Sequence, residues 1–383
     1  MKYDFDRVIE RRGTDSYKWK DYGDDVLPMW VADMDFVSAD PIIQALHQRI
    51  DHGIFGYTRP TLELRTVIQE RLKKVYQWEV GEEEIVFLPG LVTGLNLFYH
   101  AFSNPGDGVL IQPPIYFHFV RDPVIHGRVL DDPPLVQKGD TYEIDFTIFE
   151  KAIGDRTKVF LFCNPHNPVA RVFTAKELKK VAEICLRHGV LICSDEIHCD
   201  LLYPGYRHVP IATLGPEVAN QTITLMAPSK TYNLAGLHCG FAIIRNSKLR
   251  RTLQTFSLGL IPSVNIMGHM AALAAFRSGQ EWLGQVLHYL KGNRDYLAQY
   301  IKEKLPSIRM TKMEATYLAW LDCRETGIPG NPFDFFLREA KVALNDGVTF
   351  GRGGEGFVRL NFACPRKTLT EALDRMSYAL EKV

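Results

Sequence analysis

Amphipathic segments alternate with short apolar runs through residues 61–245. Apolar residues recur at helical spacing in TLELRTVIQERLKKVYQ (61–77) and TAKELKKVAEICLRHG (174–189), so both segments predict helices that bury one face. The β-rich runs between and after them predict buried strands, and they read EIVFLPG, GVLIQPP, KVFLFCNP, VLICSDE, QTITLMAPS and GFAIIR. Helices that alternate with such strands predict an α/β fold with a largely parallel sheet.

The pattern changes from about Gly284. A long helical stretch, VLHYLKGNRDYLAQYIKEKL, precedes mixed strands around TYLAWLD and GFVRLNF and a terminal helix from Thr368. We therefore expect three parts: an N-terminal segment, residues 1–50, that packs partly on the small domain; a large domain, residues 51–283, that holds the ligand; and a smaller C-terminal α+β domain, residues 284–383.

Composition narrows the class of protein. Hydrophobic residues make up 46% of the 383 residues, and Lys+Arg and Asp+Glu balance at 45 each, so overall charge favours neither nucleic acid nor an anionic membrane as partner. The start lacks the apolar stretch of a secretory signal, and we expect a cytoplasmic protein. Its seven cysteines are scattered without a CxxC pair, which predicts buried free thiols and no metal site.

Polar residues that could bind a ligand or take part in a reaction follow the predicted strands. Ligands of open α/β sheets bind at the carboxyl ends of the strands. After FLPG, a helix would begin with the amides of Leu91, Val92 and Thr93, which either bind a phosphate or form an ordinary turn. After KVFLF, Asn164 either donates to a phenolic oxygen or caps its own backbone.

Two charged residues follow the next two strands. Asp195 comes directly after VLIC, and a carboxylate there needs a partner, either a protonated ring nitrogen or a structural cation. Lys230 lies in APSKTYNLAGLHC and is either an ordinary surface lysine or an amine of lowered pKa that forms a Schiff base with a carbonyl cofactor. A phosphate turn, an amide, a carboxylate and an amine in this order together predict a pyridoxal phosphate site.

Two further residues fit that prediction. Tyr116, after a strand and two prolines, offers a ring that could stack on the pyridine or simply pack in the core. Arg359, in FVRLNF, places a guanidinium among apolar neighbours, where it either binds a carboxylate ligand or forms a structural salt bridge.

Several blocks in one order resemble a known family. They read FDRVIERRGTDSYKWK, LPMWVADMDF, FGYTRP, CNPHNPVARV, SDEIHCDL and PSKTYNLAGL. The chain resembles the fold type I, aspartate aminotransferase-like enzymes that depend on pyridoxal phosphate, and more narrowly the MalY/PatB family of cystathionine β-lyases. This resemblance covers nearly the whole chain and implies a mainly parallel seven-stranded sheet between helices.

The resemblance implies a role for each residue of the site. Lys230, Tyr116 and Tyr57 would take part in catalysis. The cofactor would be bound by the residues Lys230, Asp195, Asn164, Tyr116, Leu91, Val92, Ser229, Ile197, His198 and Tyr57. Substrate would be bound by Arg359, Asp33 and Met34. Tyr57 would reach the phosphate of the neighbouring subunit, which implies a homodimer with active sites at the interface.

The chain departs from the broader family pattern at four positions. His238 stands where a phosphate-binding arginine is usual, and Ala227 where serine is common, so we expect a less charged phosphate site. His198 stands where many relatives carry a tyrosine, as in the MalY/PatB pattern. Ala170 replaces a glycine, and alanine resists a positive φ.

The implied activity is elimination at a carbon–sulfur bond. L-Cystathionine or a related cysteine S-conjugate would give thiol, pyruvate and ammonia. The same residues could instead complete a transamination, because fold and cofactor do not choose between lyase and aminotransferase. A third hypothesis, a catalytically weak regulatory or partner-binding relative, is disfavoured by the complete set of lysine, aspartate, asparagine and arginine.

Overall fold

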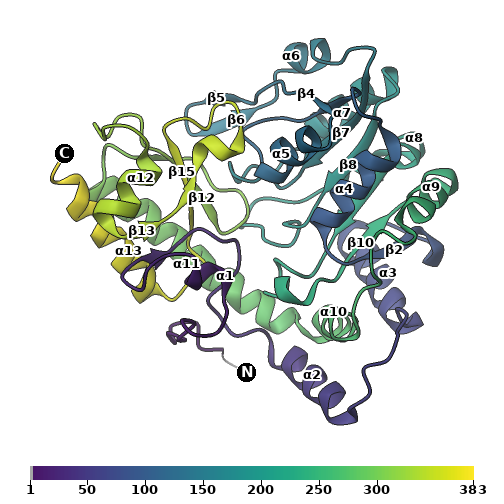
Figure 1. Ribbon diagram of the computed structural model, residues 1–383, viewed down its shortest axis with the longest axis horizontal. Coiled ribbons are helices and arrows are strands. Elements are labelled where there is room, and N and C mark those ends of the chain that lie inside the picture. Colours follow the sequence, from purple (N-terminus) through teal and green to yellow (C-terminus); the bar gives the residue numbers. More distant parts are fainter. Residues whose placement is uncertain (1–2) are drawn as a thin grey trace.

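A computed structural model describes residues 3–383 of the chain. Figure 1 shows a large sheet flanked by helices beside a smaller sheet that packs with the C-terminal helices. Within the described residues the central sheet has seven strands in the order β2, β10, β9, β8, β7, β3, β4, and all run parallel except β10. The predicted α/β fold with a mainly parallel seven-stranded sheet is confirmed.

Both faces of the central sheet are buried. Its strands are β2 (Ile85–Leu88), β3 (Gly108–Leu110), β4 (Val129–Asp131), β7 (Thr157–Cys163), β8 (Leu191–Asp195), β9 (Thr222–Met226) and β10 (Gly240–Ile243). In β7, Val159 and Leu161 join one apolar cluster, whereas Phe160 and Phe162 join the other. This alternation follows from the two-residue period of a strand, and burial on both sides explains the continuous apolar runs in the sequence.

Two groups of helices cover these faces. Helices α4 (Leu91–Phe102), α5 (Phe117–Ile125) and α9 (Ser247–Ser257) contribute to one cluster, and α6 (Phe146–Lys151), α7 (Ala175–Arg187) and α8 (Pro216–Asn220) to the other. The start of α7 is fixed by Thr174 and Glu177, which cap each other's backbone. Helices α4, α5, α7 and α8 lead the chain back across the sheet, so its parallel strands end at one common edge.

The smaller unit is built on an antiparallel sheet. Its strands follow the order β11 (Arg309–Met310), β12 (Leu318–Asp322), β15 (Phe357–Asn361), β14 (Asn345–Asp346). Helices α11 (Gln280–Lys304), α12 (Pro332–Phe335) and α13 (Arg366–Leu380) accompany it, and β5 (Val136–Lys138) and β6 (Thr141–Glu143) form a separate hairpin. The expected domain boundary at residues 283 and 284 falls inside α11, which carries the chain from one unit to the other.

The N-terminal segment contacts both units. After α1 (Tyr17–Lys20), strand β1 (Leu27–Pro28) pairs in parallel with β13 (Val342–Ala343). Further along, α2 (Asp40–His52) packs against α10 (Ile266–Ser278), which also contacts α3 (Leu62–Tyr76). Residues 30–34 between these attachments are thereby held close to the strand ends of the central sheet. Within residues 3–383 no helix has the length and apolar character needed to cross a bilayer.

Candidate active site

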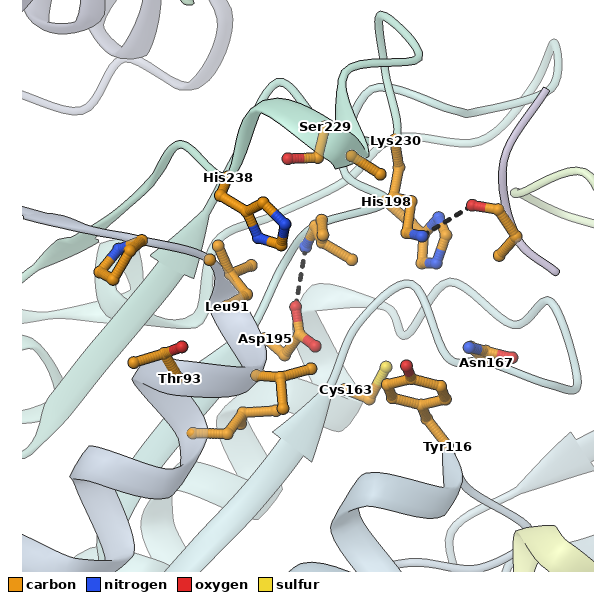
Figure 2. A pocket seen from close by; sticks show the side chains of 17 residues that line it. Leu91, Thr93, Tyr116, Cys163, Asn167, Asp195, His198, Ser229, Lys230 and His238 are labelled. Carbon is orange, nitrogen blue, oxygen red and sulfur yellow. Dashed lines mark hydrogen bonds between the residues drawn. The ribbon is translucent and has the colours of Figure 1, made fainter. Parts of the chain in front are cut away.

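A cavity of about 260 Å³ lies where several strands of the central sheet end. Figure 2 shows the side chains that line it, among them Tyr116, Asp195, His198 and Lys230. The complete lining is Ala32, Pro89, Gly90, Leu91, Val92, Thr93, Leu95, Tyr116, Cys163, Asn167, Asp195, Ile197, His198, Ser229, Lys230, Ala235 and His238. Most of the residues singled out in the sequence therefore meet in one cavity, as expected for groups that follow neighbouring parallel strands.

Lys230 enters this cavity four residues after the end of β9. Its Nζ donates a hydrogen bond to the backbone carbonyl of Ala32 at 2.7 Å (Figure 2). Burial, together with the positive charge of Arg359, lowers the pKa of the amine to about 8, although the negative charges of Asp33 and Asp195 oppose the shift. A carbonyl stabilises the ammonium less than a carboxylate does, so the amine is readily deprotonated and nucleophilic.

Asp195 is the last residue of β8 and points into the same cavity (Figure 2). Its Oδ1 accepts a hydrogen bond from the amide of Ile197 at 3.1 Å, and no ion pair to Asp195 occurs within residues 3–383. Burial raises the pKa of the carboxyl to about 7, although the Ile197 amide opposes the shift. A buried carboxyl without a cation favours a ligand that carries positive charge at this point.

Two buried nitrogen atoms near the cavity have no hydrogen-bond partner in the described part of the chain. Asn164 is fully buried; its Oδ1 accepts from the amide of Phe173 at 3.1 Å, while its Nδ2 is unpaired. His198 is buried with an unpaired Nδ1, and burial lowers its pKa to about 3, so the ring is neutral. Unpaired buried polar atoms are costly, and a ligand with oxygen atoms would satisfy them.

The N-terminus of α4 forms one wall of the cavity. Gly90 precedes the helix at φ 112°, a conformation that favours glycine, and directs the chain into the turn of Leu91, Val92 and Thr93. The first amides of a helix have no intrahelical acceptor, so they can bind an anion. Ser229 and the exposed His238 lie beside this turn (Figure 2) and complete a wall suited to phosphate.

Tyr116 faces the cavity from the start of α5 (Figure 2). Burial raises the pKa of its phenol to about 12, partly offset by Arg359, so the hydroxyl stays protonated at neutral pH. The ring is half-buried and presents an aromatic surface beside Cys163 and Asn167. Such a surface can stack on a planar heterocycle.

Arg359 lies in β15 of the smaller unit and is 2% exposed. Its Nη1 donates to Asn167 Oδ1 at 2.9 Å, and its Nη2 donates to Asn345 Oδ1 at 2.5 Å and to the carbonyl of Trp30 at 3.1 Å. Burial lowers the pKa of the guanidinium to about 10, which leaves it charged at neutral pH. The structure therefore holds a buried cation between neutral acceptors.

Five predicted site residues lie outside the cavity lining. Asp33 pairs with Arg11 at 2.7 Å, and Met34 is buried in the main apolar cluster. Tyr57 is fully exposed, in a groove that it shares with Phe55 and residues 262–267. Asn164 and Arg359 are likewise not part of the lining, but Asn167 is, and it connects the cavity to Arg359.

Comparison with known proteins gives one consistent result. The family model for aminotransferase class I and II matches residues 25–376. The chain belongs to this family, within its MalY/PatB group. It is 40% identical to cystathionine β-lyase PatB of Bacillus subtilis, with 98% of this chain and 99% of that protein aligned.

Two solved structures of this family are very similar to the present one. The crystal structure of OvoB is 41% identical, with a TM-score of 0.95 and complete coverage of both chains. Cystalysin of Treponema denticola, solved with a pyridoxal 5'-phosphate cofactor, is 32% identical, with a TM-score of 0.96 and complete coverage of both chains. The resemblance in the sequence blocks is thus confirmed over the whole chain.

Two parts of the site were missed by sequence reasoning. The carbonyl of Ala32 holds Lys230, but a backbone group leaves no mark on residue identity. Asn167 binds Arg359, and its signal was present as the second Asn-Pro pair of CNPHNP. Ala170, shortly after this pair, is fully buried and adopts φ 57°. This left-handed backbone conformation costs an alanine about 1 kcal/mol.

Proposed function

We propose that this protein is a pyridoxal phosphate-dependent carbon–sulfur β-lyase. It would act on L-cystathionine or related cysteine S-conjugates and release a thiol, pyruvate and ammonia. The observation that carries the proposal is the Lys230 amine, with a pKa lowered to about 8, in one cavity with the buried Asp195, in a chain that aligns with PatB over 98% of its length. Two similar proteins support it further: cystalysin contains a pyridoxal 5'-phosphate cofactor, and PatB is a cystathionine β-lyase.

The residues of the cavity fit pyridoxal phosphate. The unpaired Nδ2 of Asn164 and Nδ1 of His198 would bind oxygen atoms of the ring, and Asp195 would pair with the protonated ring nitrogen. Amides of Leu91 and Val92 with the Ser229 hydroxyl would bind the phosphate. When bound, the cofactor supplies an aldehyde for amines and an electron-accepting ring.

Lys230 is the residue that we expect to move protons. Its Nζ would hold the cofactor, and as a free amine it would remove the proton from the substrate Cα. A pKa near 8 leaves part of the amine unprotonated at neutral pH, which suits a general base. The Ala32 carbonyl, 2.7 Å away, fixes the position of the amine.

The remaining residues orient the substrate and exclude water. Arg359 would bind the substrate α-carboxylate, because its buried charge has only neutral acceptors in the described chain. The Tyr116 ring would cover one face of the cofactor, and Asp33 would add negative charge near the Lys230 amine. Met34 and Ile197 would shape the apolar surroundings.

The closest competing activity is transamination, which the family name itself favours. To separate the two, the enzyme is incubated with L-cystathionine and no keto acid. A lyase forms pyruvate and thiol at a steady rate. An aminotransferase gives at most one turnover per site and then stops, and that result would reject the proposal.

A regulatory or partner-binding role is the second alternative. It predicts a protein that neither binds the cofactor nor turns over substrate. An absorbance band of a pyridoxal complex that disappears in Lys230→Ala supports the enzyme, whereas a colourless protein that cannot take up the cofactor supports the alternative. Comparison of cystathionine, cysteine, cystine and alkyl-cysteines would identify the preferred substrate.

We further propose a homodimer in which Tyr57 reaches the partner's phosphate. Ile54, Phe55 and Tyr57 are exposed, and Phe55 and Tyr57 share a groove with residues 262–267, which is typical of a surface that another chain covers. Disruption of the dimer should weaken cofactor retention, and unchanged affinity in a folded monomer would reject this role.

We also propose a cytoplasmic location. All seven cysteines are buried free thiols, which supports it.

A further inference from the structure

Arg359 is one of two arginines that are buried in residues 3–383; the other, Arg128, also has only neutral acceptors but does not line the cavity or bind a residue that does. By contrast, the half-buried Arg71 pairs with Asp200, and the half-buried Arg171 pairs with Glu314 and Glu177, so each of these guanidinium groups has a carboxylate partner. Arg359 is more buried than either, yet its three acceptors are two amide oxygens and one backbone carbonyl, and its Nε has no partner within residues 3–383. Its charge is thus uncompensated inside the protein.

Asn345 is the closest of these three acceptors. It lies in β14, directly opposite Arg359 in the antiparallel pairing with β15. Its Oδ1 accepts from Nη2 at 2.5 Å, so the two side chains are neighbours on the same face of the sheet. An aspartate has almost the same shape, and at this position it would give Arg359 a carboxylate partner of the kind that Arg71 and Arg171 have.

We infer that Asn345 is a positioning residue that makes the site selective for substrates with an α-carboxylate. The amide oxygen orients the guanidinium but carries no charge, so the positive charge of Arg359 remains available to the ligand. This inference rests on the proposed role of Arg359 in carboxylate binding. It adds that selectivity depends on the neutrality of residue 345 as well as on its hydrogen bond.

Substitution of Asn345 separates these two contributions. In Asn345→Asp the hydrogen bond is kept and an internal anion competes with the ligand carboxylate. In Asn345→Leu the bond is lost and no charge is added. Asn246→Asp is the matched control, since Asn246 caps α9 far along the chain from the site and an aspartate can keep its two bonds to backbone amides.

The probe is a pair of ligands that carry no leaving group at Cβ. L-Alanine and L-alaninamide differ only in the carboxylate, and their binding to the holoenzyme is followed by the absorbance of the bound cofactor. We expect Asn345→Asp to weaken L-alanine at least about 30-fold while L-alaninamide changes less than about threefold. Asn345→Leu should weaken L-alanine less, and Asn246→Asp should change neither.

Thermal unfolding distinguishes selectivity from a structural role. Asn345→Asp should not lower the Tm of the holoenzyme, because it supplies a counter-ion to a buried cation. Equal weakening of both ligands together with a lower Tm would overturn the inference, and so would unchanged L-alanine binding. Wild-type enzyme that prefers L-alanine but forms no pyruvate from cystathionine would reject the lyase proposal and leave this inference supported.

Discussion

Lys18 and Lys230 are both lysines inside the protein, but their surroundings are opposite. Lys18 is 1% exposed and pairs with Asp35 at 2.6 Å and with Asp33 at 3.5 Å. Although burial opposes it, the charge of these carboxylates raises the pKa of Lys18. Lys230 donates only to a backbone carbonyl, and burial lowers its pKa to about 8.

The difference shows how one chain uses the same side chain for structure and for chemistry. A buried cation with carboxylate partners is fixed in its charged form and joins two parts of the fold. A cation with neutral partners has its acidity or its charge available to a ligand. Arg11, which binds Asp33 and Asp35, and Arg359, which binds two asparagines, repeat the same contrast.

The largest expected effect comes from Lys230→Met. Loss of the amine should lower pyruvate formation from cystathionine by at least about 10³-fold, because both covalent binding and proton removal are lost. The Tm of the cofactor-free protein should stay the same or rise, since an amine without a carboxylate partner is replaced by an apolar group. Lys180→Met on the exposed face of α7 is the control and should retain activity.

Lys18→Met should have the opposite effect on stability. Removal of the cation leaves Asp33 and Asp35 with less compensation, so the free energy of unfolding should fall by about 3–5 kcal/mol. Urea denaturation of the purified variants measures this. A loss below about 1 kcal/mol would mean that Arg11 alone is a sufficient partner and that Lys18 is not the structural counterpart proposed here.

The two lysines should also give opposite pH dependence in the cofactor-free protein. The folded pKa of Lys230, about 8, lies below the value of 10.5 in the unfolded chain, so the wild type should gain stability relative to Lys230→Met as pH rises from 8 to 10.5. The folded pKa of Lys18 lies above 10.5, so its contribution is complete below pH 10.5 and is lost at higher pH. Denaturant titrations from pH 8 to above pH 10.5 measure both slopes, and equal slopes would contradict the contrast.

His238→Arg should have the smallest effect of these substitutions. Like Lys230 and Arg359, the new arginine would be a cation without a carboxylate partner. His238 is exposed and lines the cavity beside the α4 turn, so an arginine there could reach the phosphate. We expect the dissociation constant of pyridoxal phosphate to fall about fivefold, measured by equilibrium titration of the cofactor-free protein. Weaker or unchanged binding would show that the site does not need more positive charge.

Much of the fold could be predicted from the sequence because both faces of the central sheet are buried. Runs such as VFLF and LIC were therefore apolar throughout and easy to recognise. Asn164, Asp195 and Lys230 could be identified because each lies at the end of a strand or within four residues after it. The local sequence pattern was therefore sufficient to identify site residues that lie at or near the end of a strand.

The remaining features depend on contacts between distant parts of the chain. Residues 11–35 and 230 are far apart in sequence, and only the folded chain brings Ala32 to Lys230 and Lys18 to Asp35. The partner of a buried lysine decides its role, so the sequence alone could not distinguish Lys18 from Lys230 by environment. Asn345 likewise became notable only through its register with Arg359.

Reductive trapping tests the central claim most directly. The holoenzyme is treated with borohydride, which fixes any bond between a lysine and the cofactor, and is then digested and analysed by mass spectrometry. The pyridoxyl group is expected on Lys230 and on no other lysine, with Lys18 unmodified. Absence of the group from Lys230, or its presence on Lys18, would contradict the assignment of these two residues.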